Sequence, residues 1–227
     1  MSKNLFITGT GTDVGKTYVT GLIVKKLREN GRTAAYYKAA MSGNARDAQG
    51  RLIPGDALLV KTISGIAQPL ESMCPYVYEA AVSPHLAARM EGKPVQLSAV
   101  RQTFQDVCRH YDYVTVEGSG GIVCPLRFDA EKLRLDELVN TLHLSSLIVA
   151  DAGLGTINSV VLTAEYMRAK GLPVKGILLN RFHPGDPMEE DNKFMCETLT
   201  GLAVLACIQP GATSLDIDAD VLASLYE

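Results

Sequence analysis

A glycine-rich segment near the N-terminus has the residue types and the spacing that bind phosphate groups. Residues 9–17 read GTGTDVGKT, after a short apolar run and before a segment with helical periodicity. Glycines let the backbone turn tightly and direct successive N–H groups at phosphate oxygens, and the start of a helix adds a positive dipole end. We therefore expect Lys16 to reach the β- and γ-phosphates of a nucleotide and the Thr17 hydroxyl to bind Mg²⁺.

The spacing of these glycines is a variant of the phosphate-loop pattern GxxxxGK[ST], because one additional residue separates Gly9 from Gly15. A dinucleotide loop of the GxGxxG type explains the segment less well, since Val14 stands where that pattern needs glycine. A glycine-rich turn with a chance GKT is the remaining alternative. The sequence favours a loop for a nucleoside triphosphate.

Two acidic residues are candidates to complete a magnesium site with Thr17, because nucleotide-bound Mg²⁺ usually takes one or two protein carboxylates. Glu117 ends the apolar run YDYVTVE and precedes the glycine-rich residues 118–121. Asp56 is the second candidate, although it also suits the N-cap of a short helix. A plain surface acid at a strand end is the alternative for Glu117.

Two further polar residues end apolar runs. Lys38 follows TAAYYK and can stabilise the charge that develops during phosphoryl transfer, although a solvated lysine explains its position equally well. Asn180 ends VKGILLN and can hydrogen-bond a base or a ribose, or serve as a turn residue.

The elements that must position these residues alternate along the chain between apolar runs and segments with helical spacing. Residues 39–55 are predicted as a polar loop. The pattern predicts strands over 4–8, 33–38, 111–117, 146–150, 174–179 and 202–208, and helices over 16–30, from 56, over 84–90, 97–110, 135–142, 157–170 and 188–199, and from 216.

Continuously apolar strands that alternate with helices indicate a parallel sheet covered on both faces. We predict a single α/β domain over residues 1–227, with a mostly parallel sheet and a fold like that of the P-loop NTPases. In such sheets ligands bind beyond the carboxyl ends of the strands, and the polar candidates fall at those ends.

The composition excludes several other classes of protein. The 227 residues carry 22 Lys and Arg against 25 Asp and Glu, a net charge of −3, so no basic surplus exists for a nucleic-acid partner. No apolar run is long enough to span a membrane. The five cysteines form no CxxC pair and are read as reduced thiols of a cytoplasmic protein, and the four histidines lack metal-ligand spacing.

Taken together, the motifs resemble those of the dethiobiotin synthetase family, in the same order and over nearly the whole chain. The phosphate loop is shared with a wide superfamily, whereas the later motifs are more specific. The matching segments are Gly9–Thr17, Tyr37-Lys38 with Ser42-Gly43, Asp56-Ala57-Leu58, Val116–Gly121, Gly153–Asn158 with Leu162-Thr163, and Asn180.

The resemblance implies an enzyme that uses ATP and Mg²⁺ to join CO₂ to 7,8-diaminopelargonic acid (7,8-diaminononanoate). One amine forms a carbamate, the γ-phosphoryl group is transferred to the carbamate oxygen, and the second amine closes the cyclic urea of dethiobiotin. This reaction is the penultimate step of biotin synthesis. The resemblance also implies a homodimer with the diamine site at the subunit interface.

Residue by residue, the resemblance implies four overlapping sets. Lys38, Lys16 and Thr12 are catalytic, and Thr17, Asp56 and Glu117 bind Mg²⁺. The substrate is held by Thr12, Lys38 and Ser42, and its carboxylate by Gly155, Thr156 and Asn158 of the partner subunit. The nucleotide is held by Asp13, Val14, Gly15, Lys16, Thr17, Tyr18, Asp56, Glu117, Gly118, Ser119, Gly120, Asn180 and Pro210.

The chain departs from the family pattern in a few places. Gly11 and Asp13 stand where members often carry Asp and Glu, and Phe194 stands near a position where a tyrosine often helps to hold the substrate carboxylate. Residues 207–212 match the usual base-binding loop poorly, and Pro210 is the residue of this segment that is expected to bind the nucleotide.

Three rival functions share parts of this pattern. Partition-type switch ATPases carry a signature lysine where this chain has Gly11. Amidoligases need a glutaminase domain, for which 227 residues leave no room unless it is a separate chain. A nucleotide-binding module without turnover is the non-enzymatic alternative. Stimulation of ATP hydrolysis by a small diamine is expected only of the ligase.

Overall fold

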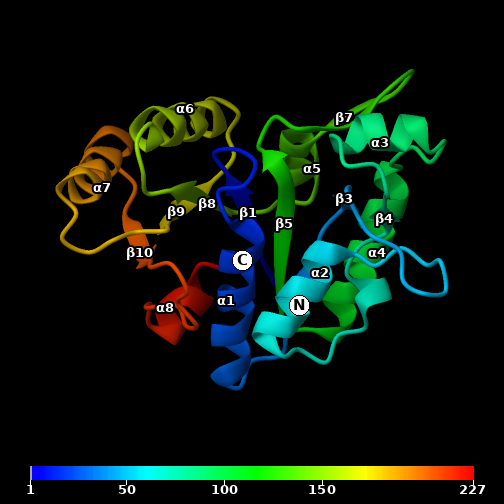
Figure 1. The fold of residues 1–227 in the computed structure, drawn as a ribbon, viewed down its shortest axis with the longest axis horizontal. Coiled ribbons are helices and arrows are strands. Elements are labelled where there is room, and N and C mark those ends of the chain that lie inside the picture. The colour runs from blue at the N-terminus through cyan, green and yellow to red at the C-terminus, as the bar shows by residue number, and fades with distance from the viewer. Residues whose placement is uncertain (1) are drawn as a thin grey trace.

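The chain folds around a six-stranded sheet in which every neighbouring pair of strands is parallel, as a computed structural model of residues 2–227 shows (Figure 1). The strand order is β10-β9-β8-β1-β5-β2, so β1 and β5 lie inside the sheet and β2 at one edge. This architecture confirms the predicted α/β class. The strands are β1 (Lys3–Gly9), β2 (Ala34–Tyr37), β5 (Tyr113–Gly121), β8 (Ser146–Asp151), β9 (Val174–Asn180) and β10 (Val204–Ile208).

Helices cover both faces of the sheet because side chains alternate along each strand. Leu5 and Ile7 belong to one buried core, and Phe6 between them belongs to the other. The first core takes residues from α1 (Lys16–Glu29), α2 (Gly55–Ser64) and α8 (Ala219–Ser224). The second takes residues from α3 (Pro84–Met90), α4 (Leu97–His110), α5 (Leu135–Thr141), α6 (Thr156–Ala169) and α7 (Pro187–Thr200).

Several short elements are not predicted by the sequence pattern. β3 (Ala40–Met41) pairs with β4 (Tyr76–Val77), and β6 (Pro125–Phe128) forms a hairpin with β7 (Lys132–Arg134). A 3₁₀ turn, η1 (Leu70–Ser72), precedes β4. Strands of two to four residues are too short to show a period, which explains why residues 39–55 were predicted as loop alone.

Two predicted details of the site region are corrected by the structure. The strand predicted to end at Glu117 continues to Gly121, where it pairs with Gly9 of β1. Asp56 is not the N-cap of α2, because the helix begins at Gly55 and Pro54 is the cap. The other predicted strands and helices between residues 3 and 208 agree with the structure to within two residues at each end.

Pro54 leaves the first turn of α2 without a side-chain cap, and Asn44 supplies the missing acceptor. The Asn44 Oδ1 atom accepts a hydrogen bond from the Gly55 N–H at 2.9 Å. Its amide nitrogen donates to the carbonyls of Met41 and Tyr78. Asn44 therefore fixes the start of α2, and with it Asp56, against β3.

Within residues 2–227 we find no helix that combines the length and the apolar character needed to cross a membrane.

Candidate active site

A cavity of about 860 Å³ opens at the carboxyl ends of β1, β2 and β5. It is lined by the phosphate loop on one side and by Lys38, Asp56 and Glu117 on the other. The fold therefore brings together residues that lie far apart in the sequence. The predicted site residues in this lining are Thr12, Asp13, Gly15, Lys16, Thr17, Tyr18, Lys38, Ser42, Asp56, Glu117, Ser119 and Gly120.

The phosphate loop connects β1 to α1 in a backbone conformation that depends on Gly15. Gly15 has φ of 87°, and a Cβ atom there would lie 2.0 Å from the Asn180 Nδ2 atom. The Asn180 Nδ2 atom itself donates to the Val14 carbonyl at 3.0 Å. Asn180 thus holds the phosphate loop by this hydrogen bond to Val14. Its contact with a base stays a prediction.

The phosphate-loop lysine lies over the loop itself. Lys16 is buried, and its Nζ atom donates to the Gly11 carbonyl at 2.6 Å. Burial, followed by the nearby Lys38 ammonium, holds the pKa of Lys16 below its ordinary value. Its hydrogen-bond partner is a neutral carbonyl, so the loop offers Lys16 no carboxylate in hydrogen-bond contact.

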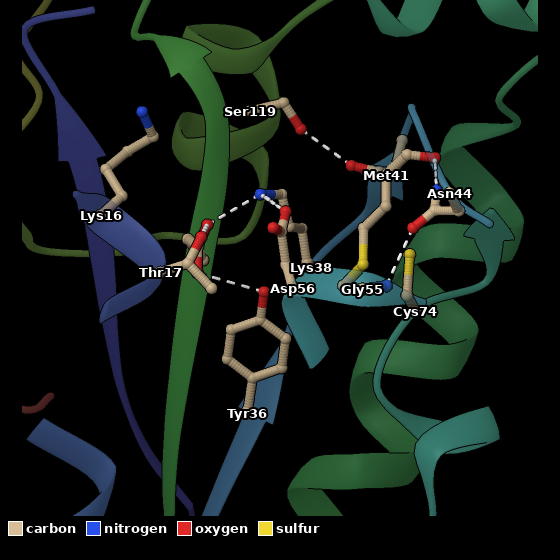
Figure 2. Close-up of polar contacts among 12 residues, drawn as sticks. Lys16, Thr17, Tyr36, Lys38, Met41, Asn44, Gly55, Asp56, Cys74 and Ser119 are labelled. Atoms are coloured by element: carbon tan, nitrogen blue, oxygen red, sulfur yellow. Dashed lines mark hydrogen bonds and ion pairs between the residues drawn. The ribbon is translucent and has the colours of Figure 1, made fainter. Parts of the chain in front are cut away.

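The opposite wall of the cavity is built from side chains. The Lys38 Nζ atom donates to Asp56 Oδ2 at 2.6 Å and to Glu117 Oε1 at 2.7 Å. The Thr17 hydroxyl donates to the same Glu117 oxygen at 2.9 Å. Figure 2 shows Thr17, Lys38 and Asp56 gathered in this cluster, with the Lys16 side chain on the other side of Thr17.

Burial and charge act in opposite directions on this cluster. Burial lowers the pKa of Lys38, but Glu117 and Asp56 raise it more, so the pKa of Lys38 lies above its ordinary value. Burial raises the pKa of Asp56, and the Lys38 ammonium outweighs it, so the pKa of Asp56 lies below its ordinary value. Lys38 is therefore charged at neutral pH, held against two carboxylates.

The oxygen atoms of this cluster are suitable ligands for a magnesium ion. Thr17, Asp56 and Glu117 offer only oxygen atoms, and a cationic group, the Lys38 ammonium, already lies between the two carboxylates. Within residues 2–227, no group of three or more His, Cys, Asp or Glu side chains is placed to hold a metal ion. Two carboxylates with a hydroxyl are the set that Mg²⁺ uses when phosphate oxygens complete its shell.

Ser119 joins β5 to the segment that carries Ser42. Its hydroxyl donates to the Ala40 carbonyl at 2.8 Å, and Gly43 donates its N–H to Ala80. These bonds place Ser42 and Gly43 in the cavity lining. Ser119 therefore shapes the part of the cavity lined by Ser42 and Gly43, and its own contact with a nucleotide stays a prediction.

The other predicted site residues lie outside this cavity lining. A Cβ atom on Gly118 would come within 2.7 Å of Leu135 and Phe6, so packing alone requires a glycine there. Pro210 is exposed in the loop after β10, which the Tyr18 hydroxyl contacts at the Ala212 carbonyl. Gly155, Thr156 and Asn158 lie at the start of α6, away from the cavity of their own chain.

Some residues of the site were missed by sequence reasoning. Arg181 lines the cavity, and its guanidinium donates to the Asp13 carbonyl and to Asp151. The Tyr36 hydroxyl donates to Glu117. Arg181 directly follows Asn180 at a strand end, a signal that could have found it, whereas Tyr36 reads as an ordinary strand residue.

Comparison with known proteins places the chain in a family. A family model described as an AAA domain matches residues 3–215. The ATP-dependent dethiobiotin synthetase BioD of Brachyspira hyodysenteriae is 45% identical over 217 residues, covering 95% of this chain and 96% of the relative. The chain belongs to the dethiobiotin synthetase family. The BioD of Clostridium botulinum is 44% identical over 227 residues, covering 100% of this chain and 99% of that protein.

This member of the dethiobiotin synthetase family is also similar in fold to solved structures of other proteins. The septum site-determining protein MinD of Pyrococcus horikoshii, solved with Mg-ADP, superposes with a TM-score of 0.56 at 15% identity. The match covers 92% of this chain and 82% of that one. At this identity the likeness shows the P-loop NTPase fold alone. The family predicted from the motifs is thus confirmed, together with the fold.

Proposed function

We propose that this chain is an ATP-dependent dethiobiotin synthetase that closes the ureido ring of dethiobiotin from a vicinal diamine and CO₂. One arrangement carries the proposal: a phosphate loop and a Lys38–Asp56–Glu117 cluster face the same cavity. The loop suits the phosphates of ATP, and the cluster places a cation beside the oxygen ligands of Mg²⁺. Positioning and charge stabilisation then carry the reaction.

The reaction begins when one amine of the diamine attacks CO₂, forming a carbamate and releasing a proton. A carbamate oxygen then attacks the γ-phosphorus of ATP, and ADP leaves, which gives a carbamic–phosphoric mixed anhydride. The second amine attacks its carbonyl carbon, the C–O bond to phosphate breaks, and phosphate and a proton depart. No covalent bond to the protein forms in this sequence.

The cavity lining agrees with a reaction that uses no protein nucleophile. It contains no histidine, and its one thiol, Cys124, has its pKa raised by burial. Lys38 and Lys16 are the groups that stabilise the carbamate oxygen and the transferred phosphoryl group. Thr12 and Ser42, in the same lining, contact the diamine or its carbamate.

Thr17, Asp56 and Glu117 would hold Mg²⁺, which neutralises phosphate charge during phosphoryl transfer. In this structure Lys38 neutralises the two carboxylates. With Mg²⁺ held by the two carboxylates, the Lys38 ammonium would be available to the substrate oxygen.

We propose further that two subunits build each diamine site. Gly155, Thr156 and Asn158 begin α6, and the Thr156 hydroxyl is buried without a hydrogen-bond partner in residues 2–227. A helix start suits the substrate carboxylate, yet these residues do not line the cavity of their own chain. Large apolar side chains are exposed on the same part of the molecule: Leu154 (92%), Leu162 (62%) and Phe194 (63%).

Mixing two inactive variants tests the shared site. Lys38→Ala removes the cation, and Asn158→Asp adds a negative charge where the substrate carboxylate would bind. If each site uses Lys38 of one subunit and Asn158 of the other, a mixed dimer contains one intact site, so mixing restores activity. If Asn158 serves its own subunit's site, mixing restores none, whereas sedimentation as a monomer rejects the dimer itself.

Labelled bicarbonate tests the proposed reaction. With Mg-ATP and the diamine, label should enter an acid-stable product, because a cyclic urea keeps its carbon in acid and a carbamate loses it as CO₂. The Lys38→Ala variant should produce little stable label. Bound ATP without any stable label would reject the ligase and favour a switch ATPase on the same fold.

A further inference from the structure

The two oxygen atoms of Glu117 face different neighbours. Oε1 accepts hydrogen bonds from Thr17 at 2.9 Å and from Lys38 at 2.7 Å, on the cavity side. Oε2 accepts a hydrogen bond from the Tyr36 hydroxyl at 3.1 Å. The Glu117 side chain is fully buried, so Tyr36 serves Oε2 where water does not reach.

We propose that Tyr36 is a positioning residue that restricts Glu117 to binding the metal ion through Oε1 alone, and so favours Mg²⁺ over Ca²⁺. This inference rests on the proposed function, because it takes Glu117 as a ligand of the Mg²⁺ that accompanies ATP. Tyr36 touches neither the nucleotide nor the metal in this account. It acts only through the carboxylate of Glu117.

The sheet fixes the direction of the Tyr36 side chain. Tyr36 of β2 is in register with Thr115 of β5, and Glu117 follows Thr115 by two residues on the same face. That face packs against α1 and α2, and the Tyr36 ring is fully buried there. Figure 2 shows the Tyr36 hydroxyl directed toward the cluster of Thr17, Lys38 and Asp56.

A second side chain fixes the backbone of Tyr36. β2 is an edge strand, so its outer N–H and carbonyl groups lack a strand partner in the sheet. The fully buried Gln68 side chain takes this place: its Oε1 accepts from the Tyr36 N–H at 2.8 Å, and its Nε2 donates to the Tyr36 carbonyl at 3.0 Å. Tyr36 is therefore held at its backbone as well as at its ring.

Metal selectivity follows from the number of carboxylate oxygens that remain free. Ca²⁺ readily takes both oxygens of a carboxylate and a larger, flexible shell, whereas Mg²⁺ demands a small octahedral shell. With Oε2 occupied by Tyr36, Glu117 offers one oxygen, which suits the smaller ion. Outer partners of metal ligands of this kind strongly influence metal affinity.

The neighbouring tyrosine is a matched control. Tyr37 is also fully buried, and its hydroxyl donates to the Val100 carbonyl at 2.9 Å on the opposite face of the sheet. Tyr36→Phe and Tyr37→Phe each remove one buried, hydrogen-bonded hydroxyl from the same strand. Only Tyr36→Phe frees an oxygen of Glu117.

The test is calorimetric titration of Mg²⁺ and of Ca²⁺ into the protein with a non-hydrolysable ATP analogue. For Tyr36→Phe we expect Mg²⁺ affinity to fall about 10-fold and Ca²⁺ affinity to change by about threefold or less. The ratio of Mg²⁺ to Ca²⁺ affinity should then drop, while Tyr37→Phe leaves it unchanged. Equal ratios in the two variants would overturn the inference.

Two further variants complete the test. Glu117→Ala should abolish tight Mg²⁺ binding; unchanged binding would reject Glu117 as a ligand and with it this part of the proposed function. If Glu117→Ala abolishes tight Mg²⁺ binding but Tyr36→Phe and Tyr37→Phe have equal ratios of Mg²⁺ to Ca²⁺ affinity, the role of Tyr36 is rejected and Glu117 remains a metal ligand. If circular dichroism shows Tyr36→Phe unfolded, Gln68→Met replaces it, with the same drop in ratio expected and an unchanged ratio contradicting the inference.

Discussion

The two lysines of the cavity differ in what holds them. Lys16 donates to a backbone carbonyl of its own loop, and its pKa lies below the ordinary value because of burial. Lys38 bridges two carboxylates, and its pKa lies above the ordinary value because their charge outweighs burial. One wall of the cavity thus holds its lysine through a backbone carbonyl, and the other holds its lysine through two carboxylates.

This difference separates the tasks of the two walls. Backbone N–H groups and a helix start bind phosphate in any protein that forms the loop, whatever reaction follows. The side-chain wall depends on the packing of three segments, because Lys38 follows β2, Asp56 lies in α2 and Glu117 lies in β5. We therefore expect changes in the first wall to affect nucleotide affinity, and changes in the second to affect turnover.

Replacing each lysine by alanine tests this separation with the largest expected effect. Lys38→Ala should lower kcat by about 10³-fold, because a cation facing the developing charge is lost, and leave ADP affinity within about threefold. Lys16→Ala should weaken nucleotide binding strongly. Steady-state kinetics and ADP titration measure both, and near-normal turnover of Lys38→Ala would remove that residue from the mechanism.

Gly15→Ala probes the backbone wall alone. The left-handed φ of 87° and the approach of Asn180 leave no room for a Cβ atom, so the loop must shift. A shift near 1 Å is expected to lower kcat/KM for ATP about 100-fold. Gly171→Ala, where φ is 66° and no atom lies within 4 Å of the added Cβ atom, is the control for backbone strain. Equal losses in the two variants would contradict the steric account.

Asn44→Ala probes the support of the side-chain wall. The variant leaves the Gly55 N–H and the Met41 carbonyl without their side-chain partner, so the free energy of unfolding should fall by about 1–3 kcal/mol. Asn30→Ala, which removes an exposed amide bonded to Lys26, should cost about 0.5 kcal/mol or less. Urea unfolding compares the two variants, and equal costs would show that Asn44 does not fix the start of α2.

The smallest expected effect is the acid dependence of the Asp56–Lys38 pair. The pKa of Asp56 lies below its ordinary value of 3.8, so its stabilising contribution is present above that pH and is lost as the pH falls through the folded-state pKa. Because Asp56 is 40% exposed, the contribution should not exceed about 1 kcal/mol. The stability difference between wild type and Asp56→Asn, measured by urea unfolding, should shrink from pH 6 to pH 3; a constant difference would contradict the pairing.

The same contrast explains what the sequence could reveal. The phosphate loop and the parallel sheet were predictable because glycine spacing and apolar periodicity are local signals. The sequence predicts Lys38, Asp56 and Glu117 as separate candidates. Position alone explains Lys38 equally well as a solvated lysine and Asp56 as a helix N-cap. The bonds among them depend on three segments meeting in space. Tyr36 and Gln68 were not predicted, because a tyrosine in a strand and a glutamine in a loop carry no signal of their own.

Oxygen transfer from CO₂ to phosphate tests the central claim most directly. Bicarbonate fully labelled with ¹⁸O supplies the carbamate oxygen, which in the proposed reaction attacks the γ-phosphorus and later leaves with phosphate. Mass spectrometry of the released phosphate should therefore find one ¹⁸O atom for each ring closed. Phosphate without ¹⁸O, released while the diamine and ATP are consumed, would show that its new oxygen does not come from CO₂ and would contradict carbamate phosphorylation in this cavity.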